Sequence, residues 1–268
     1  MKLGFIGAGN MAGAIIKGFV NKNCVNSSDI YFIRQNKEKQ AQQASELGIN
    51  GCNGYDSLIE NSDILFLGVK PVVFPTLLPQ IAKSVKKKNP LVVSMAAGLT
   101  TDSIKEMLGY DAKIIRIMPN VSAAIAMSTT AVCKNEFASD EDLATIKNLF
   151  SSIGLTTEVP ENQFAIFTAI AGCSPAYVYM FIDGLARGAQ KMGMNKQKAL
   201  EIAASAVIGS ASMYAQSNEH PQELVDKVCS PGGTTIEGVT TLEEYKFTAG
   251  VVKAVENSIL KDRELSKK

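Results

Sequence analysis

The segment at residues 230–237, SPGGTTIE, combines a backbone turn, two threonine hydroxyls and a helix start near the C-terminus. Pro231 fixes one backbone dihedral, and the paired glycines after it permit positive φ and the close approach of a ligand. Thr234 and Glu237 have the spacing of a capping box, so we expect Thr234 to cap a helix. Free N–H groups would then converge at the positive end of the helix dipole and form a seat for a small anion. The alternative is an ordinary loop and N-cap.

A second motif lies at the other end of the chain, at residues 2–13, KLGFIGAGNMAG. A short apolar strand runs into a glycine turn and then into a helical pattern, which is a dinucleotide fingerprint of the form G-x-G-x-x-A. In this form Gly7 makes the tight turn and Gly9 leaves room for a pyrophosphate. Ala12 lets the helix pack close to the strand. The sequence therefore predicts a dinucleotide site at the first turn.

The end of the second predicted strand, residues 29–33, indicates which dinucleotide binds. An acid at that end would bond the ribose 2′-hydroxyl of NAD, but the only acid of the strand, Asp29, lies at its start. The strand instead runs into Arg34, whose planar fork of donors suits a 2′-phosphate. We therefore expect NADPH to be preferred, with NADH as an alternative cofactor. The competing interpretation of Arg34 is a solvated loop charge.

Composition excludes several classes of function. Lys plus Arg number 27 and Asp plus Glu 26, and this near-zero balance gives no basis for binding nucleic acid or a membrane surface. The first residues are already strand and fingerprint, and we expect no apolar run of membrane-spanning length. Five scattered cysteines without C-x-x-C spacing favour reduced thiols in the cytoplasm over disulfides or a metal site. The single histidine, His220, lies in a polar connection, and a helix-start or loop role is expected for it.

The elements between the two motifs change in character along the chain. Apolar strands alternate with helical patterns in the first half, at residues 63–67, 91–95, 113–117 and 127–133. This alternation predicts an α/β fold with a doubly wound parallel sheet, whose ligands lie at the carboxyl ends of the strands. The small-residue loops at 68–71 and 96–98 follow such ends. We expect Pro71 to open the next helix.

After Pro160 the pattern is helical, with predicted helices at residues 164–171, 176–192, 196–215, 235–244 and 248–265. Small and apolar residues occur on nearly every face of these helices, which indicates an oligomer interface. The sequence thus predicts two domains, a Rossmann-type NADP(H)-binding domain at 1–160 and an all-helical domain for dimerisation and substrate binding at 161–268.

The motifs taken together resemble those of pyrroline-5-carboxylate reductases over essentially the whole chain. They occur in the same order, and the C-terminal motif is the most specific of them; they are residues 4–12, 69–71, 96–98, 116–120, 174–177 and 230–237. The resemblance implies reduction of Δ1-pyrroline-5-carboxylate to L-proline with NADPH or NADH, the last step of proline biosynthesis. It also implies a homodimer that in some cases assembles into a decamer.

The resemblance and the motifs together give a set of expected site residues, none of which binds a metal. Cofactor contacts are expected at the three loops and at the end of the second strand, from Ile6, Gly7, Ala8, Gly9, Asn10, Met11, Arg34, Val69, Lys70, Pro71, Ala96, Ala97 and Gly98. Substrate contacts are expected from Glu161, Ser230, Gly232, Gly233, Thr234 and Thr235. Thr235 is the expected catalytic residue, because its hydroxyl can hydrogen-bond the ring nitrogen as that atom gains basicity. For Glu161, an acid in the first turn of a helix is an equally good interpretation.

The chain departs from the family pattern at three places, with Tyr55, Val121-Ser122 and Cys173-Ser174 in place of an asparagine, Thr-Pro and Ser-Gly. Other functions therefore stay open. They are reduction of another cyclic imine, reduction of a deazaflavin, and a non-enzymatic NADP(H)-binding regulatory role. A β-hydroxy-acid reductase would carry a catalytic lysine on the long helix, and the nearest candidate, Lys191, falls at the polar end of that helix.

Overall fold

The computed structural model describes residues 1–265, and these residues form two compact units. The first unit comprises residues 1–172 and 259–265, and the second comprises residues 173–258. The first unit contains the sheet, and the second is helical.

The first unit is built on one eight-stranded sheet of order β3-β2-β1-β4-β5-β6-β7-β8. Its strands are β1 (Leu3–Ile6), β2 (Ile30–Ile33), β3 (Asn50–Gly51), β4 (Ile64–Leu67), β5 (Leu91–Ser94), β6 (Ile114–Met118), β7 (Ser128–Lys134) and β8 (Gly154–Glu158). Neighbouring strands from β3 through β6 are parallel. Because β1 pairs with both β2 and β4, the strand order reverses between β1 and β4. Ligands of such sheets bind at the carboxyl ends of the strands beside that reversal.

The far edge of the sheet differs from the all-parallel expectation, because β7 pairs with β6 antiparallel. The reason is the short connection between them, which holds only the single 3₁₀ turn Val121–Ile125. A parallel return needs a crossover of about a dozen or more residues, usually a helix. The helix α6 (Asp140–Ser151) supplies such a crossover after β7, and β8 then pairs parallel to β7. The sequence interpretation missed the strands β3 and β8.

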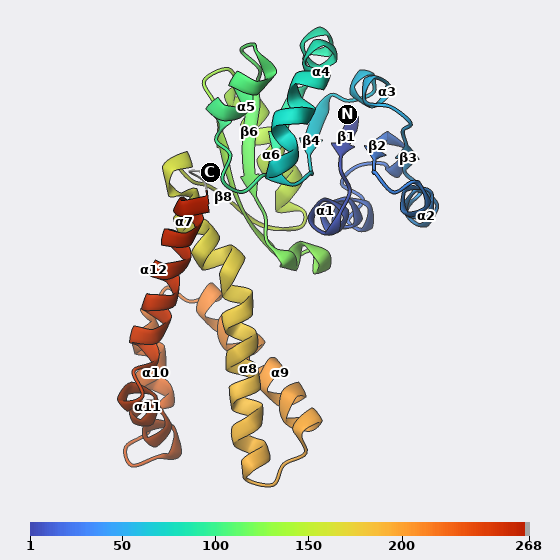
Figure 1. Ribbon diagram of the computed structural model, residues 1–268. Helices are drawn as coiled ribbons and strands as arrows, with labels where there is room; N and C mark the ends of the chain where they lie inside the picture. The colour runs from blue at the N-terminus through green and yellow to red at the C-terminus, as the bar shows by residue number, and fades with distance from the viewer. Residues whose placement is uncertain (266–268) are drawn as a thin grey trace. The chain divides into compact units, whose positions relative to one another are not determined.

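Helices cover both faces of the sheet (Figure 1). Besides α6 they are α1 (Asn10–Asn21), α2 (Lys37–Leu47), α3 (Tyr55–Glu60), α4 (Phe74–Lys88) and α5 (Thr101–Leu108). The apolar residues of α1 and α6 pack on one face, where Phe5 and Phe66 stack at 4.5 Å between ring centroids. The helices α3, α4 and α5 pack on the other face. This burial on both faces explains why the strands read as continuous apolar runs.

The C-terminal part of the chain is helical, as expected. It contains α7 (Phe164–Phe167), α8 (Ser174–Lys191), α9 (Lys196–Gln216), α10 (Pro221–Val228), α11 (Thr234–Glu244) and α12 (Phe247–Leu265). The sequence interpretation missed α10. It also separated residues 164–171 from 176–192, whereas a π-helix, Thr168–Cys173, joins α7 directly to α8. Pro175 has no N–H to donate to the carbonyl of Ala171 four residues earlier, and that carbonyl accepts from Asn120 Nδ2 at 3.0 Å instead.

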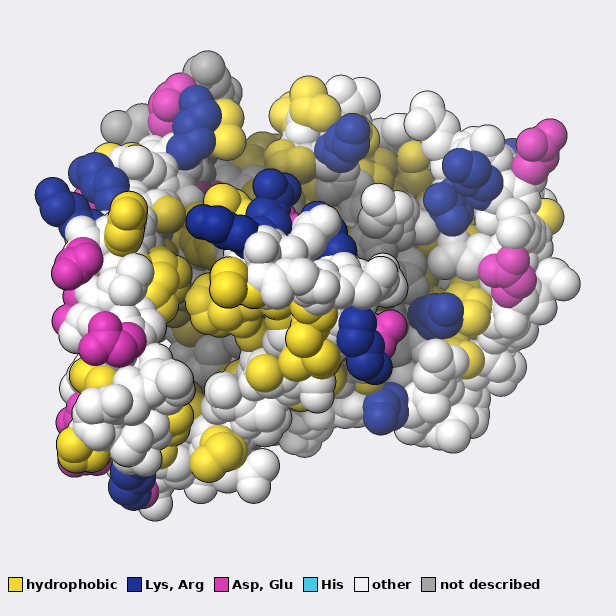
Figure 2. Space-filling view, turned by 90° about the horizontal axis from the view of Figure 1, so that it is seen from below, with side chains coloured by type: hydrophobic (Ala, Val, Ile, Leu, Met, Phe, Trp, Pro, Cys, Tyr) yellow, Lys and Arg dark blue, Asp and Glu magenta, His cyan; other side chains and the backbone are white. Residues whose placement is uncertain are grey.

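This helical run corrects one expectation, because Glu161–Lys191 is long and apolar enough to cross a membrane by length and composition alone. Only 17% of its most apolar window is buried. Hydrophobic side chains are exposed along α8 and α9, among them Met180, Leu185 and Ile208. Figure 2 shows hydrophobic side chains open on one face of the molecule. Contiguous exposed apolar surface marks an interaction site.

Candidate functional site

The turn between β1 and α1 has the backbone geometry that the fingerprint predicts. Gly7 adopts φ +90°, which favours glycine, and donates its N–H to the carbonyl of Ile33 at 3.0 Å. A Cβ added to Gly9 would meet no atom within 4 Å, so the space beside this residue is open. No side chain caps the start of α1, and its first N–H groups are left for a ligand. The turn is therefore shaped to receive a group with negative charge.

Gly68 packs against this turn, a role that the sequence analysis did not assign when it placed Gly68 in the loop after the strand. It follows β4 and donates its N–H to the carbonyl of Ile6 at 2.8 Å. A Cβ on Gly68 would lie 2.6 Å from the carbonyl oxygen of Gly7 and 2.8 Å from the Cβ of Ala12. The glycine turn and the first helix can approach β4 only because this position has no side chain. The signal in the sequence was the glycine directly after an apolar strand.

The sheet brings three of the predicted cofactor loops to one edge, because β1, β4 and β5 are neighbours. Residues 69–71 follow β4, and Pro71 opens the 3₁₀ turn that leads into α4, as predicted. Residues 96–98 follow β5, where Gly98 adopts φ +77° and redirects the chain toward α5. Lys70 and Ala97 are exposed in these loops. One continuous surface is thus available to an extended ligand.

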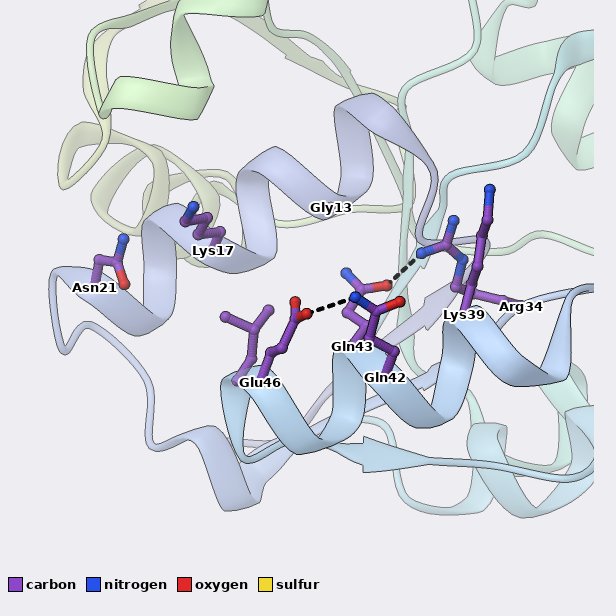
Figure 3. Close-up of a pocket in the computed structure, with 9 residues that line it drawn as sticks. Gly13, Lys17, Asn21, Arg34, Lys39, Gln42, Gln43 and Glu46 are labelled. Carbon is purple, nitrogen blue, oxygen red and sulfur yellow. Dashed lines mark hydrogen bonds between the residues drawn. The ribbon is translucent and has the colours of Figure 1, made fainter.

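Arg34 lies at the corresponding end of β2, beside a groove of about 540 Å³ between α1 and α2 (Figure 3). The groove is lined by Gly13, Lys17, Asn21, Arg34, Lys39, Gln42, Gln43, Glu46 and Leu47. Three of these side chains are cationic and one is acidic, so the local charge favours an anion. Arg34 donates from Nη1 to Gln43 Oε1 at 2.8 Å. The guanidinium is thus held in place at the strand end where a 2′-phosphate would distinguish NADPH from NADH.

Glu161 lies in the first unit, in a cluster of polar contacts. Its carboxylate accepts from the backbone N–H of Thr101 at 2.8 Å, from the Thr101 hydroxyl at 3.0 Å and from Arg116 Nη1 at 3.2 Å. Arg116 is only 5% exposed and stacks 4.5 Å above the ring of Phe164. Glu161 therefore binds the first N–H of α5 and neutralises a buried cation, and a substrate contact from it stays a prediction. Arg116 and Thr101 were missed, although an arginine inside the apolar strand IIRIM was a signal.

Burial raises the pKa of the Cys133 thiol to about 12, and the nearby Glu161 charge acts in the same direction. A thiol with this pKa is protonated at neutral pH and is not a nucleophile. No group of three or more His, Cys, Asp or Glu side chains within residues 1–265 could hold a metal ion.

The loop before α11 is the predicted anion seat, and its capping differs from the prediction. Gly232 adopts φ +65°, and Gly233 donates its N–H to the carbonyl of Ser230 at 3.0 Å. Gly233 is the N-cap, so Thr234 is the first helical residue and makes no capping box with Glu237. The reason is the glycine turn, which lets the helix begin one residue earlier than a threonine cap would.

This correction leaves the first N–H groups of α11 without a side-chain acceptor. They lie at the positive end of an eleven-residue helix, beside the half-buried Thr235. In contrast, His220 caps α10, where its Nδ1 accepts from the N–H of Gln222 at 3.2 Å. This confirms the helix-start role expected for the histidine. Lys191 is the last residue of α8, at the polar end where the sequence placed it.

A glycine turn at the strand-order reversal of a mostly parallel sheet is typical of a dinucleotide-binding protein with a Rossmann-type domain, and the cations near Arg34 favour NADP. Family models agree with this class. Residues 2–98 match the model described as NADP oxidoreductase coenzyme F420-dependent, and residues 161–265 match the model of pyrroline-5-carboxylate reductase dimerisation. The chain belongs to the pyrroline-5-carboxylate reductase family, because reductases of that name are 34% to 40% identical to it over 99% to 100% of its length.

Individual relatives match over nearly the full length. The chain is 40% identical to pyrroline-5-carboxylate reductase of Escherichia coli, with 99% of this chain and 98% of that protein covered. The structure of the Streptococcus pyogenes reductase matches with TM-score 0.88 at 38% identity, covering 98% of each chain. The Plasmodium falciparum pyrroline carboxylate reductase with NADP bound matches with TM-score 0.89 at 29% identity, covering 99% of this chain and 98% of that one.

Proposed function

We propose that this protein reduces Δ1-pyrroline-5-carboxylate to L-proline with NADPH, the last step of proline biosynthesis. The observation that carries the proposal is the uncapped start of α11, where a glycine turn presents backbone N–H groups beside Thr235. A cyclic imine with one carboxylate needs an anion seat and a hydrogen-bond donor for the ring nitrogen, and this loop contains both. The names of the full-length relatives support the same substrate.

The chemistry divides between the loop and the cofactor. The N–H groups of Thr234 and Thr235 bind the substrate carboxylate, and the Ser230 hydroxyl, Gly232 and Gly233 shape the same loop. NADPH supplies the hydride that reduces the C=N carbon. The Thr235 hydroxyl hydrogen-bonds the ring nitrogen and relays a proton to it from water, since threonine is too weak an acid to act as the proton source. The protein contributes to the rate mainly by positioning the substrate against the cofactor.

The cofactor residues fit a bound dinucleotide. The open side of Gly9 and the uncapped N–H groups of Asn10 and Met11 suit the pyrophosphate, and Arg34 suits the 2′-phosphate. Ile6, Gly7 and Ala8 shape the turn. Residues 69–71 and 96–98 extend the same edge of the sheet, toward the nicotinamide half of the cofactor.

We also propose that the two domains have separate roles. Residues 1–160 hold NADP(H), and residues 161–268 dimerise and bind the substrate. The exposed apolar side chains of α8 and α9 support a homodimer, because a second copy would remove this surface from water. Assembly into a decamer and a cytoplasmic location stay predictions.

The decisive experiment follows NADPH absorbance with and without the imine. The expected result is oxidation of NADPH that depends on Δ1-pyrroline-5-carboxylate and forms proline in equal amount. Oxidation of NADPH only with a different cyclic imine would change the substrate assignment but keep the reaction type. NADPH binding without turnover of any imine would favour the regulatory role. The departures from the family pattern at Val121 and Ser174 are the reason for considering that role.

A further inference from the structure

Two glutamines of α2 hydrogen-bond to Arg34. Gln40 Oε1 accepts from the backbone N–H of Arg34, and Gln43 Oε1 accepts from its Nη1, each at 2.8 Å. Gln40 is only 6% exposed, and its Nε2 donates to the carbonyl of Cys52 at 2.9 Å. The two glutamines are three residues apart and therefore share one face of the helix. The backbone and the guanidinium of Arg34 are thus fixed by the same element.

The side-chain amide of Gln43 packs against α1. Figure 3 shows its side chain reaching from α2 to the guanidinium of Arg34, with α1 alongside. A Cβ added to Gly13 of α1 would lie 3.4 Å from Gln43 Nε2, so the amide sits against the backbone of α1. Its neighbour Gln42 is exposed and donates to Glu46 at 2.7 Å, and it does not touch Arg34. Only one of the two adjacent glutamines therefore contacts the cation.

We propose that Gln43 is a positioning residue that makes the protein prefer a 2′-phosphorylated dinucleotide. A carboxamide oxygen orients the guanidinium without cancelling its charge, whereas a carboxylate in its place would compete with the phosphate. An arginine has five N–H donors, and a bond at Nη1 leaves the others for a phosphate. Holding the side chain before the ligand arrives reduces the ordering cost of binding. The proposal rests on the assignment of Arg34 to the 2′-phosphate in the proposed function.

The test measures dissociation constants of NADP⁺ and NAD⁺ by titration calorimetry on the full-length protein. Gln43→Ala should weaken NADP⁺ binding about tenfold, the effect of losing one hydrogen bond to a charged group, and leave NAD⁺ within twofold. Gln43→Glu keeps an acceptor for Nη1 but adds a charge, and should weaken NADP⁺ at least as much. Ser45→Ala, at an exposed position of the same helix that does not line the groove, is the matched control, with both constants unchanged.

A double variant separates positioning from a general effect on the fold. If Gln43 acts through Arg34, Arg34→Ala/Gln43→Ala should bind NADP⁺ no more weakly than Arg34→Ala alone. Unchanged NADP⁺ affinity in both Gln43 variants, equal weakening of both dinucleotides, or additive losses in the double variant would each overturn the proposal. These titrations contain no imine, so a protein that binds NADP⁺ but reduces no imine counts against the proposed function alone.

Discussion

Thr235 is the side chain on which the proposed chemistry depends most. Replacing it by alanine should lower kcat/KM for the imine about 10²- to 10³-fold, because one positioned donor is lost in the transition state. Steady-state NADPH oxidation measures this. Thr240→Ala is a control on the same helix, where the hydroxyl donates to the backbone carbonyls of Ile236 at 3.0 Å and Glu237 at 3.2 Å. Activity of Thr235→Ala within a few-fold of the unaltered protein would remove Thr235 from the mechanism.

Arg34 is the corresponding side chain for cofactor choice. Arg34→Ala should raise the KM for NADPH about 10- to 100-fold, because a charge-assisted contact with the 2′-phosphate is lost, and should barely change the KM for NADH. Steady-state kinetics with each cofactor checks this. Equal changes for the two cofactors would refute the 2′-phosphate assignment.

Two glycine variants test how the elements around the turn from β1 to α1 pack to form the site. Gly68→Ala should destabilise the protein by about 1–3 kcal/mol, since the new methyl group meets Gly7 and Ala12 below normal contact distance. Gly9→Ala should leave the free energy of unfolding nearly unchanged, because its side is open, and yet weaken NADPH binding strongly. Denaturant unfolding and NADPH titration measure the two effects. Both variants behaving alike in the two assays would contradict this division of roles.

Elements also explain where the chain departs from its sequence pattern. The helices α7 and α8 join through a π-helix, in which the carbonyl of Ala171 finds its donor in Asn120 rather than in Pro175. The motif residue Asn120 thereby acquires a structural role, and its Oδ1 accepts from the N–H of Thr129 at 3.2 Å. One amide side chain fixes both the strand β7 and the helical run.

For the whole molecule, the exposed apolar surface leads to a prediction about assembly. Ile208, in the middle of α9, is 64% exposed. If a second copy covers it, Ile208→Glu should raise the dimer dissociation constant at least about 100-fold, because a charge would be buried without a partner. Analytical ultracentrifugation measures this, with Ser45→Glu on α2 as a charge control. A dimer as tight as that of the unaltered protein would exclude Ile208 from the interface.

Local patterns were sufficient for the elements whose cause is local. The glycine turn at Gly7, the apolar parallel strands and the helical C-terminal part all follow from short-range sterics and hydrophobic periodicity. The alternation of strands and helices was also sufficient for the fold class, because parallel strands need helical crossovers. The family followed from motifs in a fixed order.

Contacts between distant residues required the folded chain. The close approach at Gly68 and the pairing of Arg116 with Glu161 join segments far apart in the sequence. The antiparallel pairing of β7 with β6 depends on the short connection between the two strands, which the strand pattern alone did not distinguish from a crossover. The one-residue shift of the cap before α11 depended on a backbone angle that two glycines leave free. No sequence motif predicts the hydrogen bond from Arg34 to Gln43. A glutamine on a polar helix face acquires such a role only when the fold places a cation beside it.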